Sequence, residues 1–435
     1  MLKSNPENIP ASSTPPLVRV HETGSFWRQY APYIGPGLMV AVGYMDPGNW
    51  ATDIAGGAQF GYQLLSVILI SSLFAMLLQH LALKLGIATG LDLAQACRQY
   101  YSRPVAMALW VLCEIAIAAC DLAEVLGSAI ALNLLFGIPL SVGVVITTLD
   151  VLLILYFQNK GFRVLETIVG GLIGVILLCF LYEVVVSQPD IAAIFGGLIP
   201  QKQIITNPKM LYVAIGILGA TVMPHNLYLH SSIVQTRNYP RDETGKASAI
   251  RFATIDSTAS LSLAFLVNAA ILILAAATFH FSGNQNVADI TDAHRLLDPL
   301  LGAQFAGMFF AIALLAAGQN ATLTGTLAGQ IVMEGFLNIK LKPWLRQLIT
   351  RGIALVPALV VTMLYGERGT SDLLVFSQVI LSLQLSFAVV PLVVFTSNTQ
   401  KMGQFANSPT LKYLSWAVAT VIMFLNLYLL VGLVF

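Results

Sequence analysis

Two short stretches, each within a long apolar segment, decide the fold. Residues 43–49 read GYMDPGN, and residues 220–226 read ATVMPHN. Proline removes a backbone donor and clashes with the preceding helical turn, so both stretches predict a break in a helix. They share the pattern X-Pro-x-Asn, and the residues before the prolines, Asp46 and Met223, lie 177 positions apart. Each break leaves backbone polar groups that need partners other than those of a regular helix.

The composition predicts a membrane protein with many spans. The 435 residues are 57% hydrophobic and 10% charged, and the mean hydropathy is +0.79, whereas soluble proteins carry about 25% charged residues. The 22 basic and 21 acidic residues nearly cancel, which excludes a basic nucleic-acid-binding protein and an acidic disordered chain. The four cysteines form no CxxC pair, so neither a disulfide framework nor a structural zinc site is expected.

Eleven segments have the length and character of spanning helices, which need about 20 mostly apolar residues. They lie at residues 32–57, 62–86, 104–135, 139–157, 164–187, 210–235, 250–280, 301–337, 344–365, 371–396 and 411–434. With the N-terminus inside, 18 of the 22 Lys and Arg residues fall on the cytoplasmic side. This bias predicts a cytoplasmic N-terminus and an external C-terminus. Residues 1–27 are polar, contain no signal peptide, and are expected to form a disordered tail.

The two breaks are five spans apart, so the broken helices cross the bilayer in opposite directions. Paired interruptions of this kind are typical of an inverted repeat with a substrate site between the broken helices. The alternative is that each proline only kinks its helix. The sequence therefore predicts an all-α polytopic protein with these parts: a cytoplasmic tail (1–31), a first repeat (32–187), an external loop (188–209), a second repeat (210–397), and a cytoplasmic loop with helix 11 (398–435).

The polar groups at the breaks form a mixed set of candidate metal ligands. Asp46 is an ionisable residue within a span, which is a functional hypothesis by default. Asn49 offers an amide oxygen, Met223 a thioether sulfur, and the backbone at Gly43 and Ala220 free carbonyls. Oxygen ligands alone would suit Mg²⁺ or Ca²⁺, whereas a soft sulfur favours transition metals. The alternative for Met223 is an apolar residue with a packing role.

Three carboxylates in the third span suggest a proton path. Glu114, Asp121 and Glu124 are spaced by seven and three residues, which places them on one helical face. Acidic residues within a membrane often relay protons. Alternatively they form buried ion pairs with Arg346 or Arg351, which is compatible with a relay.

Histidines add weaker candidates. Histidine side chains ordinarily titrate near physiological pH, so His225 and His230 could carry protons, while His80 is expected to be structural. An intramembrane protease using Asp46 and Asp121 would leave the inverted repeat without a role. The sequence also lacks the Gly-x-Gly-Asp context of such proteases. A haem enzyme could pair His80 with His225 or His230, but no loop chemistry supports it. No enzyme is therefore expected.

Four stretches together resemble the Nramp family of proton-coupled divalent metal transporters. They are DPGN at 46–49, MPH at 223–225, GQNATLTGT at 318–326 and SQV at 377–379. The resemblance extends from about residue 30 to the C-terminus. It implies a LeuT-type 5+5 inverted repeat, with helices 1 and 6 broken and an eleventh helix outside the repeats.

The resemblance also implies roles for particular residues. Metal would be bound by Asp46, Asn49 and Met223, with the Ala220 carbonyl in one state and Gln378 in another. The proton path would include Asp46, Asp121, Glu124 and His225. Two positions depart from the frequent family pattern: Gly43 replaces an alanine, and Gln347 follows Arg346 where a second arginine is common. Arg351 is the candidate to replace that arginine.

The expected function is import of Mn²⁺ and Fe²⁺ coupled to proton entry, because the prokaryotic members of this family import manganese. The expected substrates are the metal ion and the proton. No prosthetic group, nucleic acid or obligate protein partner is expected, and the expected surroundings are the lipid bilayer of a bacterial inner membrane. The alternative is a carrier of Mg²⁺ or amino acids on the same architecture.

Overall fold

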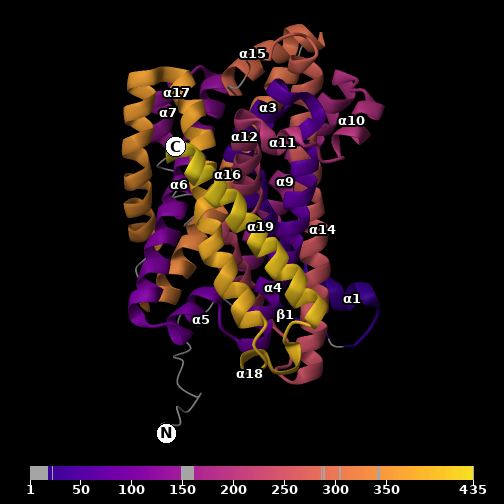
Figure 1. Cartoon of the computed structure of the whole chain (residues 1–435), viewed down its shortest axis with the longest axis vertical. Coiled ribbons are helices and arrows are strands. Elements are labelled where there is room, and N and C mark those ends of the chain that lie inside the picture. Colours follow the sequence, from indigo (N-terminus) through magenta and orange to yellow (C-terminus); the bar gives the residue numbers. More distant parts are fainter. Residues whose placement is uncertain are drawn as a thin grey trace.

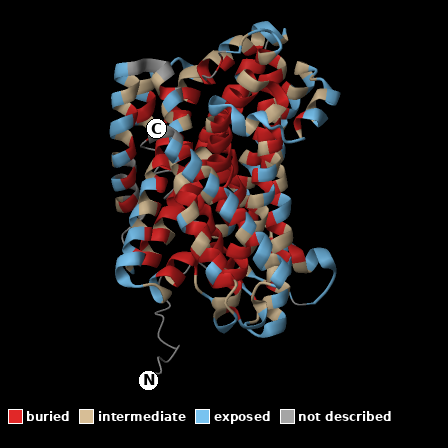
Figure 2. Cartoon of the chain, viewed as in Figure 1, coloured by how far each residue is buried: buried red, intermediate tan, exposed pale blue. Residues whose placement is uncertain are grey.

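The computed structural model describes residues 18–21, 23–147, 161–285, 287, 290–302, 305–339 and 343–434. Within them the chain forms a bundle of helices (Figure 1). Buried residues fill the middle of the bundle, and many outward positions are exposed (Figure 2). Large apolar side chains are among the exposed ones, including Leu178 at 69% and Leu364 at 71%. Apolar faces of this extent need a lipid solvent, so this is a multi-pass membrane protein.

The first five predicted spans correspond to one run of helices. These are α2 (Pro36–Val42), η2 (Gly43–Met45), α3 (Pro47–Phe60), α4 (Leu65–Thr89), α6 (Arg103–Phe136), α7 (Leu140–Thr147) and α9 (Phe162–Ser187). The turn η3 (Gly61–Leu64) joins α3 to α4, and the short α5 (Leu93–Tyr100) precedes α6. The remainder of the fourth predicted span, from residue 148, lies outside the described residues.

The later spans form a second run. These are α12 (Pro208–Thr221), α13 (Pro224–Ile233), α14 (Glu243–Ala275) with the π-helix η5 (Ala276–His280), α16 (Ala306–Leu337), α17 (Pro343–Thr396) and α19 (Pro409–Val434). The short connecting helices are α10 (Ile191–Gly197), α11 (Gln203–Thr206), α15 (Ile290–Leu301), α18 (Thr399–Met402) and η6 (Gly403–Phe405). α17 covers the ninth and tenth predicted spans and doubles back on itself (Figure 1).

Eight helical segments in the described residues are long and apolar enough to cross a membrane, and two shorter apolar helices, Pro36–Met45 and Gly352–Leu364, accompany them. Some boundaries differ from the prediction: α14, for example, begins at Glu243 and not at residue 250. The eighth span begins at Ala306 and not at residue 301, because the polar helix α15 ends at Leu301. Asp298 of α15 accepts a hydrogen bond from the Gly307 backbone at 2.7 Å, which fixes this corner.

Both predicted breaks are present, and they interrupt the helices completely. At the first, Asp46 is extended with φ −72° and ψ 167°, and α3 begins at Pro47. At the second, Met223 is extended with φ −72° and ψ 125°, and α13 begins at Pro224. Proline suits the first position of a helix because its missing N–H would have no partner there. The prolines therefore start new half-helices, and the alternative of simple kinks is excluded.

The N-terminal segment is ordered where the structure describes it. β1 (Val18–Arg19) pairs in parallel with β2 (Arg237–Asn238), and α1 (Phe26–Tyr30) and η1 (Ala31–Tyr33) follow. Phe26, Tyr30 and Tyr33 pack around Phe252 of α14. The expectation of disorder through residue 27 is wrong for this part, because the aromatic contacts and the strand pairing hold it against the bundle.

Candidate functional site

The first break presents a carboxylate with one oxygen satisfied and one not. Asp46 caps α3: its Oδ1 accepts from the Asn49 backbone at 2.8 Å and from Asn49 Nδ2 at 2.7 Å. Its Oδ2 has no hydrogen-bond partner among the described residues, and the side chain is fully buried. A buried carboxylate oxygen without a partner is costly. It is therefore available to a cation.

Backbone and amide groups surround this carboxylate. Asn49 Nδ2 lies 3.4 Å from the Gly43 carbonyl. Asn268 of α14 donates to the Tyr44 carbonyl at 2.8 Å and lies 3.4 Å from Asn49 Oδ1. Asn268 thus supports the unwound segment from the opposite repeat. Asn268 was not predicted as a site residue, although an asparagine inside an apolar span is visible in the sequence.

The second break brings a carbonyl and a sulfur into the interior. Ala220 belongs to the last turn of α12, where carbonyl groups have no helical partner. Met223 is fully buried and packs against Ala116, Ala119 and Cys120 of α6 and Leu381 of α17. The thioether is therefore held between two spans that do not belong to either broken helix.

Gln378 of α17 lies directly against both breaks. A Cβ at Gly48 would stand 1.8 Å from Gln378 Nε2, and one at Gly219 would stand 2.2 Å from the Gln378 carbonyl oxygen. At Gly219 the neighbour is backbone, so a side chain there would force the helices apart, whereas at Gly48 the end of the buried Gln378 side chain would have to move. The amide donates to Ser377 Oγ at 2.9 Å, while its Oε1 has no partner among the described residues. That oxygen is a second buried acceptor, beside Gly48 at the first break.

The donor set is therefore mixed: carboxylate, amide and carbonyl oxygens with one thioether. No group of three His, Cys, Asp or Glu side chains that could hold a metal occurs within the described ranges. Hard oxygens with one soft sulfur suit a divalent transition-metal ion held loosely enough to leave.

The carboxylates of α6 divide into two environments. Asp121 and Glu124 are buried, and Cys120 Sγ lies 3.6 Å from Glu124 Oε1. The same sulfur lies 3.8 Å from His225 Nε2. Cys120 therefore stands between His225 of the second broken helix and Glu124. Sequence reasoning missed this cysteine, because an apolar span gives no sign of which neighbour a thiol meets.

Glu114 belongs to a different group. It lies 3.4 Å from Arg346 Nη2 and accepts from Trp110 Nε1 at 3.1 Å. The predicted ion pair with Arg346 is thus present for Glu114. Arg351 lies in α17, and its side chain is outside the described residues.

The histidines have separate partners. His230 Nδ1 lies 2.9 Å from Gln79 Oε1, and Gln79 donates to the Tyr44 hydroxyl at 2.6 Å. His230 is thereby connected to the first break. His80 Nδ1 instead lies 3.0 Å from the hydroxyl oxygen of Thr254, a half-buried residue of α14.

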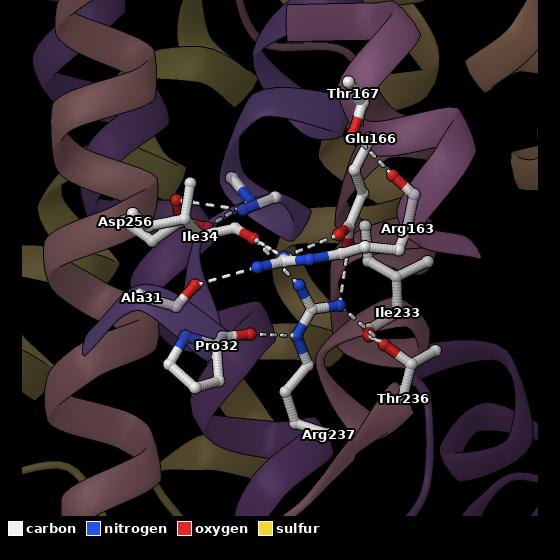
Figure 3. A network of polar contacts seen from close by, with 12 residues as sticks. Ala31, Pro32, Ile34, Arg163, Glu166, Thr167, Ile233, Thr236, Arg237 and Asp256 are labelled. Atoms are coloured by element: carbon white, nitrogen blue, oxygen red, sulfur yellow. Dashed lines mark hydrogen bonds and ion pairs between the residues drawn. The ribbon is translucent and has the colours of Figure 1, made fainter. Parts of the chain in front are cut away.

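A network of charged residues ties the start of the first span to three other elements (Figure 3). Glu166 of α9 accepts from Arg237 at 2.7 Å and from Arg163 at 3.0 Å. Arg237 is 1% exposed and also donates to the Pro32 and Ile34 carbonyls, both at 3.0 Å. We call Arg163, Glu166, Arg237 and Asp256 the span-one network.

Asp256 of α14 completes the span-one network. It accepts from the backbone of Gly35 at 3.3 Å and of Gly37 at 2.6 Å. Gly35 has φ +137°, and a Cβ there would stand 2.3 Å from the Glu166 side chain. Sequence reasoning missed the network, because its members lie far apart in the chain. The acids within spans five and seven were the only available indication.

Two broken helices that meet at a buried polar centre are typical of the LeuT-type architecture of secondary transporters. The chain matches the family model described as natural resistance-associated macrophage protein-like over residues 37–432. It belongs to the Nramp family.

Individual relatives agree with this assignment. A protein of Listeria innocua named divalent metal cation transporter MntH is 63% identical over 413 residues, covering 95% of this chain and 92% of the relative. The crystal structure of the Eremococcus coleocola manganese transporter has a TM-score of 0.89 at 44% identity, covering 97% of this chain and 90% of that one. Mhp1, at 16% identity and a TM-score of 0.63 with 97% and 92% coverage, shares the fold alone. These relatives are named as transporters and not as enzymes.

Proposed function

We propose that this protein imports divalent transition-metal ions, Mn²⁺ and Fe²⁺, together with protons. The observation that carries the proposal is the buried Asp46 carboxylate, whose Oδ2 lacks a partner among the described residues at a helix break. Asn49, Met223, the Ala220 and Gly43 carbonyls and Gln378 are the further proposed ligands. The relatives named as divalent metal cation and manganese transporters support the same substrate.

Transport would proceed by alternating access around this buried centre. The half-helices α2 and α3, and α12 and α13, meet at the two breaks, so each half can move without unwinding the other. The span-one network would have to separate before the centre could open on its side of the membrane. Mg²⁺ and amino-acid carriers on the same fold remain the alternative, and the buried Met223 sulfur favours a transition metal.

Protons would move along α6 and the second broken helix. The proposed members are Asp46, Asp121, Glu124 and His225, with Glu114, His230, Arg346 and Arg351 as further members. Cys120 supports a link between the two groups, because its sulfur lies close to both Glu124 and His225. Proton transfer would then respond to the metal through the same helix segment that contacts Met223.

The proposed location is the bacterial inner membrane with a cytoplasmic N-terminus. The bias of basic residues in the loops supports this orientation. The proposed units are the tail (1–31), the first repeat (32–187), an external loop (188–209), the second repeat (210–397) and the final loop with helix 11 (398–435).

The test is ion uptake by the purified protein in liposomes, with and without a pH gradient that is acidic outside. Mn²⁺ and Fe²⁺ should enter, the gradient should accelerate entry, and internal acidification should accompany it. Asp46→Ala, reconstituted to the same density, is the control. Uptake of Mg²⁺ or an amino acid without Mn²⁺ uptake would overturn the proposal. Mn²⁺ uptake without proton movement would overturn the coupling alone.

A further inference from the structure

A small basic pocket lies beside the span-one network. It has a volume of about 280 Å³, and its lining includes Arg19, His21, Arg28 and Arg163, with Ala31 and Pro32 behind them. This volume equals that of about nine liquid water molecules, which is ample for a phosphate group and its ester carbons. The pocket is separate from the proposed metal centre, and it shares only Arg163 with the span-one network.

The charges around the basic pocket do not balance. Glu166 is shared between Arg163 and Arg237. Neither Arg19 nor Arg28 has an ion-pair partner among the described residues. In the sequence of residues 18–31, Glu22 is the single acid beside these two arginines and His21. Uncompensated guanidinium groups around a concave surface favour an anion, and phosphate matches their geometry.

The helix next to the pocket carries apolar aromatic side chains that face outward. Trp27 is 70% exposed and Phe26 is 43% exposed, while Phe26 and Tyr30 anchor α1 to Phe252 of α14. Figure 1 shows α1 projecting sideways from the bundle, beside α14 and above the level of α18. Tryptophan in such a position is typical of the membrane–water interface. The anion is therefore expected to come from the bilayer.

We propose that the basic pocket binds the phosphate of an anionic phospholipid from the leaflet that faces the N-terminus. With the proposed orientation, on which this inference rests, the pocket faces the cytoplasmic leaflet. That leaflet carries anionic lipids, which attract basic residues near a membrane surface. The lipid chains would lie along α14 beside Phe26 and Trp27.

Binding is linked to one conformation of the transporter. One wall is η1 at the start of the first span, and another is Arg163 of α9, whose guanidinium donates to the Ala31 carbonyl at 3.0 Å (Figure 3). If the span-one network separates, these walls separate too. A lipid that fits only the assembled pocket shifts the population toward the state in which the network is closed.

Binding is tested on the metal-free, full-length protein in detergent, so the result does not depend on transport. The probes are short-chain phosphatidylglycerol, short-chain phosphatidylcholine and inorganic phosphate at equal ionic strength. Bound lipid is counted by native mass spectrometry, and affinity is obtained from thermal stabilisation. Phosphatidylglycerol should bind and stabilise, whereas phosphatidylcholine and phosphate should do so at least about tenfold more weakly.

The variant is Arg19→Gln with Arg28→Gln, two exposed residues outside the span-one network. It should lose phosphatidylglycerol affinity at least about tenfold, since each basic residue contributes about a fivefold factor. The matched control is Arg103→Gln with Lys412→Gln, two exposed cations away from the pocket. An equal loss in the control would overturn the site in favour of general surface charge. Equal binding of inorganic phosphate would overturn the lipid, and unchanged affinity of the pocket variant would overturn the proposal.

Discussion

At the scale of single residues, the two carboxylate oxygens of Asp46 at the first break have different surroundings. Asp46 Oδ1 holds the start of α3 through Asn49, while Oδ2 remains available in a buried setting. Asn49 is therefore both a candidate ligand and the group that orients Asp46. The two residues should not contribute equally to metal binding.

Asp46→Ala should reduce Mn²⁺ binding and uptake to background, because it removes the only formal negative charge at the breaks. Asn49→Ala should weaken binding by about 10- to 100-fold, the usual effect of losing a group that orients a ligand. Isothermal titration in detergent and uptake in liposomes measure both. Near-parental uptake by Asp46→Ala would place the metal elsewhere.

Met223→Ala should change selectivity more than it changes Mn²⁺ transport. A thioether binds Mn²⁺, Fe²⁺ or Cd²⁺ appreciably and contributes little to Ca²⁺ or Mg²⁺. Without the sulfur, Cd²⁺ uptake should fall most, and excess Ca²⁺ or Mg²⁺ should begin to inhibit Mn²⁺ uptake. Competition uptake assays test this. If the variant keeps the parental ranking of ions, Met223 is a packing residue.

Gly48→Ala tests the contact between the first break and Gln378. The added Cβ would stand 1.8 Å from Gln378 Nε2, and overpacking of this kind costs about 1–3 kcal/mol. The variant should have a lower melting temperature and weaker Mn²⁺ binding. Adding Gln378→Ala to Gly48→Ala should restore the melting temperature. A double variant as unstable as the single one would show that another neighbour is responsible.

Sequence reasoning selected Asp46, Asn49 and Met223 because two prolines five spans apart share the pattern X-Pro-x-Asn, whereas isolated prolines such as Pro357 and Pro391 lie within the continuous helix α17. It did not reach Asn268, because a single polar residue in a regular span does not show what it will face. It did not reach Cys120 either, since a thiol is compatible with ordinary packing. Contacts between helices determine the neighbours of Asn268 and Cys120, and local sequence patterns do not reveal these contacts.

At the scale of elements, the breaks matter because other elements hold the half-helices. α2 is fixed at its start by the backbone contacts of Gly35 and Gly37 with Asp256 of α14. The Pro32 and Ile34 carbonyls are held by Arg237, which follows α13. The span-one network therefore joins the beginning of one broken helix to the end of the other.

The short helix α5 provides a pH-sensitive contact outside the spans. Asp92 accepts from the Gln95 backbone at 2.8 Å and caps α5, and the neighbouring Leu93 N–H donates to Ser231 of α13 at 2.9 Å. Burial raises the pKa of Asp92 from 3.8 to about 7, although the hydrogen bonds from the Gln95 and Ala94 backbone oppose this. The folded protein therefore keeps a proton that the unfolded chain releases.

Because the folded-state pKa of Asp92 is raised, binding of its proton stabilises the folded protein. This contribution to the free energy of unfolding is fully present below the ordinary pKa of 3.8, and it is lost as the pH rises toward about 7. Asp92→Asn keeps a good helix cap and should flatten the pH dependence of the melting temperature in this window. The control is Asp190→Asn at the exposed cap of α10, which should leave the profile unchanged. An unaltered profile in Asp92→Asn would contradict the assignment.

At the scale of the whole molecule, the repeat architecture could be predicted, because two breaks and the loop charges both constrain the number and direction of the spans. The order of the N-terminal segment could not. Residues 18–31 contain no apolar run, and the described part, 18–21 and 23–31, is held by β2 and Phe252, which lie more than two hundred residues away. Long-range pairing of this kind leaves no local trace in the sequence.

The proposed coupling between metal and proton would be a property of the whole molecule. Met223, in the second broken helix, packs against Cys120 of α6, and that helix also carries Asp121 and Glu124. If these carboxylates carry protons and do not ligate metal, Asp121→Asn and Glu124→Gln should keep Mn²⁺ affinity within about twofold of the parent, because neither variant removes a metal ligand. Both variants remove a titrating group while preserving size, so the buried packing is retained.

The expected defect is in the response to a pH gradient. Coupling free energies between sites are typically 1–3 kcal/mol, so stimulation of Mn²⁺ uptake by the gradient should be on the order of tenfold in the parent and close to absent in Asp121→Asn. Mn²⁺ binding is measured by titration. The proton entry that accompanies Mn²⁺ uptake is measured with a pH-sensitive dye inside the liposomes. The control is Ser128→Ala, because Ser128 is uncharged and lies on α6 together with Asp121. Asn320→Asp in α16 is not a suitable control, because it would add a buried charge. A loss of Mn²⁺ affinity in Asp121→Asn as large as in Asp46→Ala would move Asp121 into the metal site and remove the separate proton path.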